Sequence, residues 1–357
     1  MMEMDQESSN PSKRIKQDSS KSGYQIPWIE KYRPQLLADV VGNEETVSRL
    51  QAIAEDGNLP NLILCGPPGT GKTTSVHALA RQLLGTAYKD AVLELNASDA
   101  RGIEVVRNTI KSFAMTQVKL PPGRHKIIIL DEADSMTTSA QQALRRTMEV
   151  YSNTTRFCLA CNVSTKIIEA IQSRAAILRY SRLSHDQMLT NLLKVCQAEQ
   201  VNYTDSGLEA ILFTAEGDMR NALNNLQASN TLAKGLANSS SSGDATAAGV
   251  VDEKIVFQVC DQPHPNVVRD MVNYCHQGDL HHANAQLQKL WTLGYSASDI
   301  IGTLFKVTKA HTDLPEGKKL EYLREIGFTH MRISNGVNSL LQLLGLMGRL
   351  CQNNQIN

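Results

Sequence analysis

The sequence lacks any excess of charge and any long apolar run. Its 357 residues include 36 basic and 36 acidic side chains, so the formal net charge is zero. That balance excludes a chain that attracts nucleic acid through its overall charge, and any such binding would need charges gathered on one face. No segment approaches the roughly 18 consecutive apolar residues of a membrane span, and the opening MMEMDQESSN has no basic and apolar signal pattern. We therefore expect an intracellular chain with no membrane contact.

The cysteines are few, and their spacing matches no disulfide framework. The seven cysteines are scattered and odd in number, which favours reduced thiols in an intracellular protein. Cys158 and Cys161 form one isolated CxxC pair, and no second pair or histidine lies near them in the sequence. We interpret both as buried strand positions rather than as metal ligands.

Short apolar segments alternate with helical patterns through the first half of the chain. The strand-like segments are Leu62–Cys65, Val92–Leu95, Lys126–Leu130, Arg156–Cys161 and Ala176–Tyr180. The helical patterns between them are Lys72–Leu84, Val105–Ala114, Ser139–Tyr151 and Lys166–Ser173. This alternation predicts an α/β fold in which helices cover both faces of a parallel sheet.

A chain of this length contains more than one domain, since a single core rarely grows far beyond 200 residues. Changes in composition along the chain indicate five regions. We expect a disordered polar tail at 1–22, an α/β core at 23–183, a small helical domain at 184–233, a flexible Ser/Ala-rich loop at 234–250 and an all-helical domain at 251–357. A basic cluster in the tail, Lys13–Lys16, fits a nuclear import signal and fits a solvated tail equally well.

The strongest motif is a glycine-rich loop between the first strand and the first long helix. It matches GxxxxGK[ST] in full, in the strand-to-helix context that phosphate binding requires. Its glycines let backbone N–H groups turn toward a phosphate at the positive end of the helix dipole. Lys72 would reach the β/γ-phosphate oxygens and Thr73 would bind Mg²⁺. The predicted ATP-binding residues of this loop are Gly66, Pro67, Pro68, Gly69, Thr70, Gly71, Lys72, Thr73 and Thr74.

A second motif places two carboxylates at the tip of a buried strand. The segment Ile127–Leu130 is followed by Asp131 and Glu132. Asp131 would orient Mg²⁺ through its water shell, and Glu132 would polarise the attacking water. Beside a complete phosphate loop, the pair predicts ATP hydrolysis with Mg²⁺ as the cofactor.

The order of these motifs resembles the AAA+ family of P-loop ATPases. The tetrad Asp131–Asp134 after GPPGTGKT is typical of that family, and Asn162 and Arg220 occupy positions similar to its sensor-1 and sensor-2 residues. The resemblance implies a helical lid at 184–233, with Asn162 reading the γ-phosphate and Arg220 folding onto the phosphates. It also implies that Asn162 follows a strand lying between the two strands that carry the motifs.

Longer segments resemble the small subunits of replication factor C, the eukaryotic clamp loader, from about Tyr24 to Leu350. The matching segments are Trp28–Pro34, Val41–Asn43, Glu94–Asp99, Ala143–Glu149 and Ser173–Arg174. Three others are similar to one branch of these subunits, namely Tyr203–Glu209, Asp261–Pro265 and Asn338–Gln342.

This resemblance implies a five-subunit arc that opens the sliding clamp PCNA and places it on primer–template double-stranded DNA, in the nucleus, for replication and repair. Region 251–357 would be the collar that joins the other replication factor C subunits. Arg174 would be an arginine finger for the neighbouring subunit's ATP, although a strand-edge ion pair is an alternative. Ile29 and Val41 would flank the adenine ring, with plain core packing as the alternative.

The resemblance also predicts DNA contacts on the inner face of the arc. Arg107 and Lys111 are four residues apart and share one helix face, and the full set is Arg101, Arg107, Lys111 and Lys166. No aromatic residues interleave with these charges, which favours phosphate contacts over base stacking. A solvated helix face explains them as well.

Two other functions fit parts of the pattern. One is a scaffold subunit that binds ATP with little hydrolysis, but such subunits usually lack part of the set formed by Lys72, Thr73, Asp131 and Glu132. The other is a different AAA+ remodelling machine, which would be expected to carry an aromatic pore loop where this chain has the polar segment Asn96–Asp99.

Overall fold

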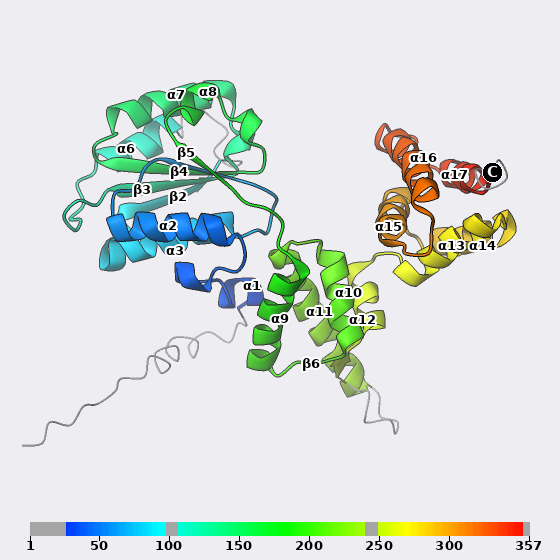
Figure 1. The fold of residues 1–357 in the computed structure, drawn as a ribbon. Coiled ribbons are helices and arrows are strands. Elements are labelled where there is room, and N and C mark those ends of the chain that lie inside the picture. Colours follow the sequence, from blue (N-terminus) through cyan, green and yellow to red (C-terminus); the bar gives the residue numbers. More distant parts are fainter. Residues whose placement is uncertain (1–25, 98–105, 240–248, 353–357) are drawn as a thin grey trace, which may run out of the picture.

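The computed structural model describes residues 26–97, 106–239 and 249–352. The predicted tail at 1–22 and Arg101 lie outside these residues. Figure 1 shows three successive parts, an α/β core, a helical lid and a third helical domain.

The core contains a five-stranded sheet in which every recorded pairing is parallel. Its strands are β1 (Leu62–Cys65), β2 (Val92–Asn96), β3 (Lys126–Asp131), β4 (Thr155–Cys161) and β5 (Ala176–Arg179). Their order across the sheet is β2-β3-β4-β1-β5. The predicted α/β fold is confirmed, and β4 lies between the strands that carry the two motifs.

Helices cover both faces of this sheet because its strands alternate their side chains. Leu62 and Leu64 pack into one core cluster and Ile63 into another. Helices α2 (Glu44–Asp56) and α3 (Lys72–Leu84) lie on one face (Figure 1). The other face carries α6 (Lys111–Met115), α7 (Thr138–Val150) and α8 (Glu169–Gln172). Short turns join these elements at η2 (Leu37–Asp39), η3 (Gly85–Ala87), α4 (Tyr88–Ala91), η4 (Val106–Ile110), η5 (Ala133–Ser135) and η6 (Ser164–Lys166).

The lid is built from α9 (His185–Glu199), α10 (Asp205–Ala215), α11 (Met219–Ser239) and α12 (Glu253–Cys260), with short strands β6 (Asn202–Tyr203) and β7 (Val250–Val251). Ser184 begins α9 with a capping box that includes Gln187. Two predicted boundaries need correction. Helix α11 continues to Ser239 rather than ending at 233, and α12 packs into the lid core through Val256 and Phe257. The third domain therefore starts near residue 262 rather than 251.

The first helix, α1 (Trp28–Lys31), also packs on the lid. Trp28 is buried in the lid cluster, and its backbone N–H donates to Gln227 Oε1 at 3.0 Å. The Tyr32 hydroxyl donates to Glu199 at 2.7 Å. The first residues of the predicted core region 23–183 therefore pack on the lid, because the buried side chain of α1 contacts lid side chains.

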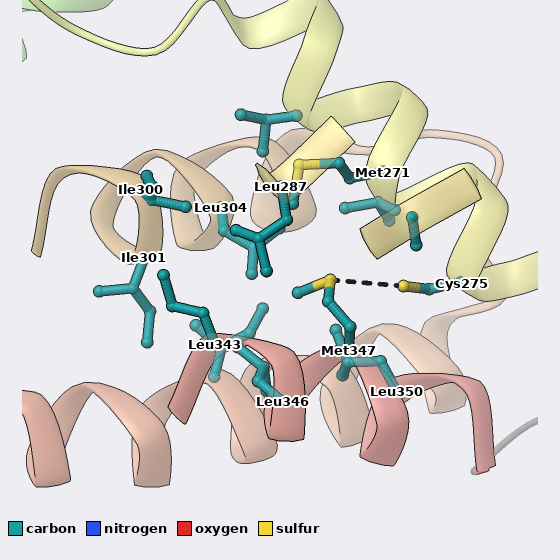
Figure 2. Packing of buried hydrophobic residues seen from close by; sticks show 14 of the residues in the cluster. Met271, Cys275, Leu287, Ile300, Ile301, Leu304, Leu343, Leu346, Met347 and Leu350 are labelled. Atoms are coloured by element: carbon teal, nitrogen blue, oxygen red, sulfur yellow. Dashed lines mark hydrogen bonds between the residues drawn. The ribbon is translucent and has the colours of Figure 1, made fainter. Parts of the chain in front are cut away.

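The third domain consists of α13 (Pro265–Gln277), α14 (Leu280–Thr292), α15 (Ala297–Ala310), α16 (Glu316–Ser334) and α17 (Leu340–Gln352). Figure 2 shows its core, where side chains such as Met271, Leu287 and Leu346 meet between the helices. Among the described helices, none combines the length and apolarity that crossing a membrane would demand.

Truncating this core should destabilise the third domain. Leu346 is fully buried on α17, whereas Leu341 on the same helix is 74% exposed. We expect Leu346→Ala to lower the free energy of unfolding by about 2–5 kcal/mol, since it removes buried methyl groups and leaves a cavity. Leu341→Ala should change it by less than about 0.5 kcal/mol. Urea unfolding followed by tryptophan fluorescence measures both, and equal effects would contradict the packing described here.

Candidate active site

The glycine-rich loop wraps the start of α3 at the carboxyl end of β1. Gly69 and Gly71 adopt φ angles of +65° and +92°, which glycine tolerates and other residues resist. A Cβ at Gly69 would lie 1.7 Å from an Asp218 carboxylate oxygen, so the lid approaches the loop too closely for any side chain there. Glycine at these positions therefore permits both the turn and the close approach of the lid.

Lys72 is held at the centre of this loop. Its ammonium group donates to the carbonyls of Gly66 and Pro67, both at 2.7 Å, and to Asn162 Oδ1 at 3.2 Å. Burial lowers the pKa of Lys72, while the nearby Asp131 carboxylate opposes that shift. The side chain is only 8% exposed, so a positive charge is concentrated in a poorly hydrated loop. Such a charge gains strongly from a phosphate group placed beside it.

The two carboxylates stand at the carboxyl end of β3, next to this loop. Asp131 Oδ2 accepts from the Thr73 hydroxyl at 3.1 Å, and its other oxygen accepts from the Glu132 N–H at 2.9 Å. Glu132 has a φ of +51°, a left-handed conformation that a side-chain-bearing residue adopts at a cost. Strain of this kind concentrates at functional sites, and here it turns Glu132 toward the pocket that it lines.

The Thr73 hydroxyl and the Asp131 carboxylate fit Mg²⁺. Magnesium prefers hard oxygen ligands and usually takes only one or two from the protein, with waters and substrate phosphates completing its shell. Within the described parts of the chain, no cluster of three or more His, Cys, Asp or Glu side chains is arranged to hold a metal. A site that shares the ion with a nucleotide therefore suits these residues better than an all-protein metal centre.

Asn162 follows β4, which lies between β1 and β3. This strand order places Asn162 between the loop and the carboxylates, and it lines the same pocket. The two cysteines of the CxxC pair are buried in β4, as predicted. Burial raises the pKa of both thiols to about 12, so neither is a ready metal ligand or nucleophile.

The lid reaches the pocket through the start of α11. The Met219 N–H donates to the Gly69 carbonyl at 3.1 Å, and Arg220 lines the pocket. The Arg220 charge is close enough to lower the pKa of Lys72, behind the larger effect of burial. Two positive side chains, one from the core and one from the lid, therefore face the same space.

One pocket gathers most of the predicted nucleotide residues. Its lining includes Ile29, Val41, Pro68, Gly69, Thr70, Gly71, Lys72, Thr73, Thr74, Asp131, Glu132, Asn162 and Arg220. Gly66 and Pro67 shape the loop through their carbonyls but do not line the pocket. The pocket is also lined by residues that the sequence motifs do not predict as nucleotide contacts, among them Glu30, Tyr32, Arg33, Val40, Leu183, Asn191, Met219 and Leu223. The motif Trp28–Pro34 carried a signal for the first three, whereas Asn191 and Leu223 lie on lid helices with no local signal.

Arg174 lies at the opposite end of the sheet from the pocket. Ala176 begins β5 and pairs with Leu62, four residues before Gly66, so the strand alone spans roughly 13 Å between them. Arg174 precedes Ala176 and pairs with Glu149 at 2.7 Å, with 41% of its side chain exposed. The ion pair left open as an alternative is present. Exposed pairs are typically worth at most about 1 kcal/mol, so this one does not bind Arg174 tightly.

The predicted DNA-contacting residues are only partly described. Lys111 begins α6 and Lys166 ends η6, and both are exposed. Arg107 falls in the helical turn η4, and Arg101 lies outside the described residues. The exposure of the two lysines leaves both interpretations of these charges open.

Comparisons with known proteins agree with this geometry. A family model described as "ATPase family associated with various cellular activities (AAA)" matches residues 62–183. A second, described as "Replication factor C C-terminal domain", matches residues 263–349. The second match begins where the structure places the start of the third domain.

Curated relatives match nearly the whole chain. "Probable replication factor C subunit 2" of Dictyostelium discoideum is 58% identical over 91% of this chain and 92% of its own length. "Replication factor C subunit 4" of Saccharomyces cerevisiae is 54% identical over 91% and 96%. Both names are those of replication factor C subunits, the family that the sequence resembles.

Solved structures show the fold alone. The RuvB Holliday junction branch migration motor of Thermotoga maritima is 18% identical and superposes with a TM-score of 0.52 over 68% of this chain and 78% of the other. Identity and coverage are far higher for the replication factor C relatives. The chain therefore belongs to the replication factor C small-subunit family of AAA ATPases.

Proposed function

We propose that this chain is an ATP-hydrolysing subunit of a five-subunit clamp loader, which opens the sliding clamp PCNA and loads it on primer–template DNA. One observation carries the proposal. The pocket holds a phosphate loop and two carboxylates, but Arg174 lies at the far end of the sheet. An arginine placed there is too far from its own nucleotide pocket to act in it, but in a ring or arc of subunits it would serve a neighbour's nucleotide.

Within the pocket, the chain's own side chains divide the work. Lys72 and the loop N–H groups bind the phosphates, and Thr73 with Asp131 would hold Mg²⁺. The ion would neutralise charge on the phosphates. Glu132 would orient and polarise a water for attack, Asn162 would hold the γ-phosphate end, and Arg220 would follow the lid onto the phosphates. Ile29 and Val41, which also line the pocket, would flank the adenine.

The DNA and cellular parts of the proposal rest on family membership and on two exposed lysines. Lys111 and Lys166 would track DNA phosphates together with Arg107 and Arg101. We propose the nucleus as the location, since loading clamps for replication and repair takes place on nuclear DNA. The other replication factor C subunits would bind chiefly through the third domain.

Replacing Glu132 by Gln should separate binding from hydrolysis. The amide keeps the size of the side chain but removes the charge that polarises water, so hydrolysis at this site should fall about 10²- to 10⁴-fold. ATP affinity should stay within about twofold, because Glu132 bears on the attacking water rather than on the bound phosphates. Single-turnover hydrolysis and titration with a fluorescent ATP analogue measure the two quantities, with exposed Glu55→Gln on α2 as the control. Unchanged hydrolysis in Glu132→Gln would favour the scaffold alternative.

A loading assay tests the proposed function directly. A fluorescently labelled clamp is mixed with primed circular DNA, ATP and the five purified subunits, and the DNA is isolated by gel filtration. We expect label to elute with the DNA only when both ATP and this chain are present. ATP-driven DNA remodelling without clamp retention would support a different AAA+ machine instead.

A further inference from the structure

The end of α10 carries an acidic residue in an uncommon backbone conformation. Glu216 follows Ala215 with a φ of +49°, a left-handed conformation in which glycine or asparagine is more favourable. Its N–H closes the helix by donating to the Leu212 carbonyl at 3.3 Å. The sequence keeps a glutamate here despite that cost, so the contacts of its carboxylate matter.

The Glu216 carboxylate pairs with cations from two other parts of the molecule. Arg182, in the segment that connects β5 to α9, donates to Oε2 at 3.0 Å and to the Glu216 carbonyl at 3.1 Å. Lys306, on α15 of the third domain, pairs with Oε1. Partial burial raises the pKa of Glu216, but hydrogen bonds from Lys306 and Arg182 outweigh that effect and lower it. The group is therefore a charged link at neutral pH.

The third-domain side of this link is supported by packing. Lys306 lies over the Phe213 ring, 5.8 Å from its centroid, and Phe213 packs against both the lid core and the third-domain core. The Lys306 side chain is 28% exposed and that of Glu216 38%. Water therefore screens this pair in part, and the packing of Phe213 supports the contact beside it.

A short stretch of backbone connects Glu216 to the nucleotide pocket. The next residue, Gly217, accepts from the Leu183 N–H at 3.3 Å, and Met219 donates to the Gly69 carbonyl of the phosphate loop. Arg220, which lines the nucleotide pocket, follows Glu216 by four residues. Only a short stretch of backbone, anchored to the phosphate loop at Met219, therefore separates Glu216 from the lid arginine.

We propose that Glu216 is a positioning residue that couples the third domain to the nucleotide pocket through Arg182 and Lys306. In this proposal, which rests on the clamp-loader function above, the position of the third domain in the assembled arc sets where Arg220 meets the phosphates. Glu216 touches no nucleotide itself. Its effect should appear in the response of ATP turnover to the clamp and DNA, rather than in ATP binding.

The test uses the assembled five-subunit complex with Glu216→Gln, Lys306→Met and the double variant. Glu209→Gln on α10 and Lys309→Met on α15 are matched controls, since each removes the same charge from an exposed position of the same helix. ATP affinity, complex assembly and clamp- and DNA-stimulated turnover are measured for each. We expect both single variants to lose about 5- to 50-fold in stimulated turnover while ATP affinity stays unchanged. The stimulated turnover of the double variant should equal that of the more impaired single variant, because the two residues act as one link.

Two results would overturn the inference. One is stimulated turnover in Glu216→Gln equal to that in Glu209→Gln. The other is loss of assembly in both single variants, which would show that the ion pair only holds domains together. If the wild-type complex itself shows no stimulation by clamp and DNA, the proposed function fails, and that result is separate from either outcome for Glu216.

Discussion

Replacing Lys72 by Ala is expected to remove most ATP affinity from this chain. The ammonium group sits in a poorly hydrated loop with three acceptors around it, so its bond to a phosphate would be largely desolvated. Deleting one partner of such a charged contact typically costs about 2–5 kcal/mol. At about 1.4 kcal/mol per factor of ten, ATP should bind roughly 30- to 3000-fold more weakly. Titration with a fluorescent ATP analogue measures the change.

Two controls guard this result. Lys89→Ala removes an exposed lysine from α4 and should leave the affinity unchanged. Lys72→Met keeps the aliphatic stem that packs in the loop, so it should lose affinity as Lys72→Ala does while preserving the fold. ATP affinity within threefold of wild type in Lys72→Met would show that the loop binds nucleotide without this charge.

Replacing Arg174 by Ala should leave this chain's own ATP binding intact and impair its neighbour's hydrolysis. Arg174 lies across the sheet from the pocket, so it does not contact the nucleotide of its own chain. Arginines supplied in trans contribute about 10³- to 10⁵-fold to phosphoryl transfer. Hydrolysis at the adjacent subunit's site should fall by the same factor. The stimulated turnover of the whole complex should fall by at least the fraction of turnover that this adjacent site contributes.

The ion pair with Glu149 provides the alternative to exclude. If Arg174 served only that pair, Arg174→Ala would cost at most about 1 kcal/mol of stability and leave turnover unchanged. Arg49 is a matched control, because it is also exposed and also pairs with a glutamate, Glu45 on α2. Arg49→Ala should keep full stimulated turnover. Equal turnover in the Arg174→Ala and Arg49→Ala complexes would reduce Arg174 to a surface ion pair.

Local patterns explain which parts of the fold could be predicted from the sequence. Strand β1 and helix α3 have the predicted bounds, because an apolar run, a glycine-rich turn and a helical pattern follow one another without interruption. The remaining four strands differ from prediction by one residue at an end. Helix α8 is shorter than the predicted 166–173, since Lys166 ends the separate turn η6. Ends of elements depend on hydrogen bonds that composition does not reveal.

Long-range packing explains what the sequence left hidden. The phosphate loop and the Asp131–Glu132 pair were found because each motif is contiguous. Asn191 and Leu223 enter the pocket only because the lid folds over the core, and α12 joins the lid only because Val256 and Phe257 fill its cluster. The link from Arg182 through Glu216 to Lys306 joins residues up to 124 positions apart, as 306 minus 182 shows, and no local pattern marks it.

The central claim is that this chain both hydrolyses ATP in a clamp loader and completes its neighbour's site. The most direct measurement is ATP turnover by the reconstituted complex, with and without clamp and primed DNA, for wild type, Lys72→Ala and Arg174→Ala. We predict strong stimulation in wild type and its loss in both variants, with ATP binding to this chain retained in Arg174→Ala. Stimulation equal to wild type in both variants would contradict the claim and leave the chain a structural member of its assembly.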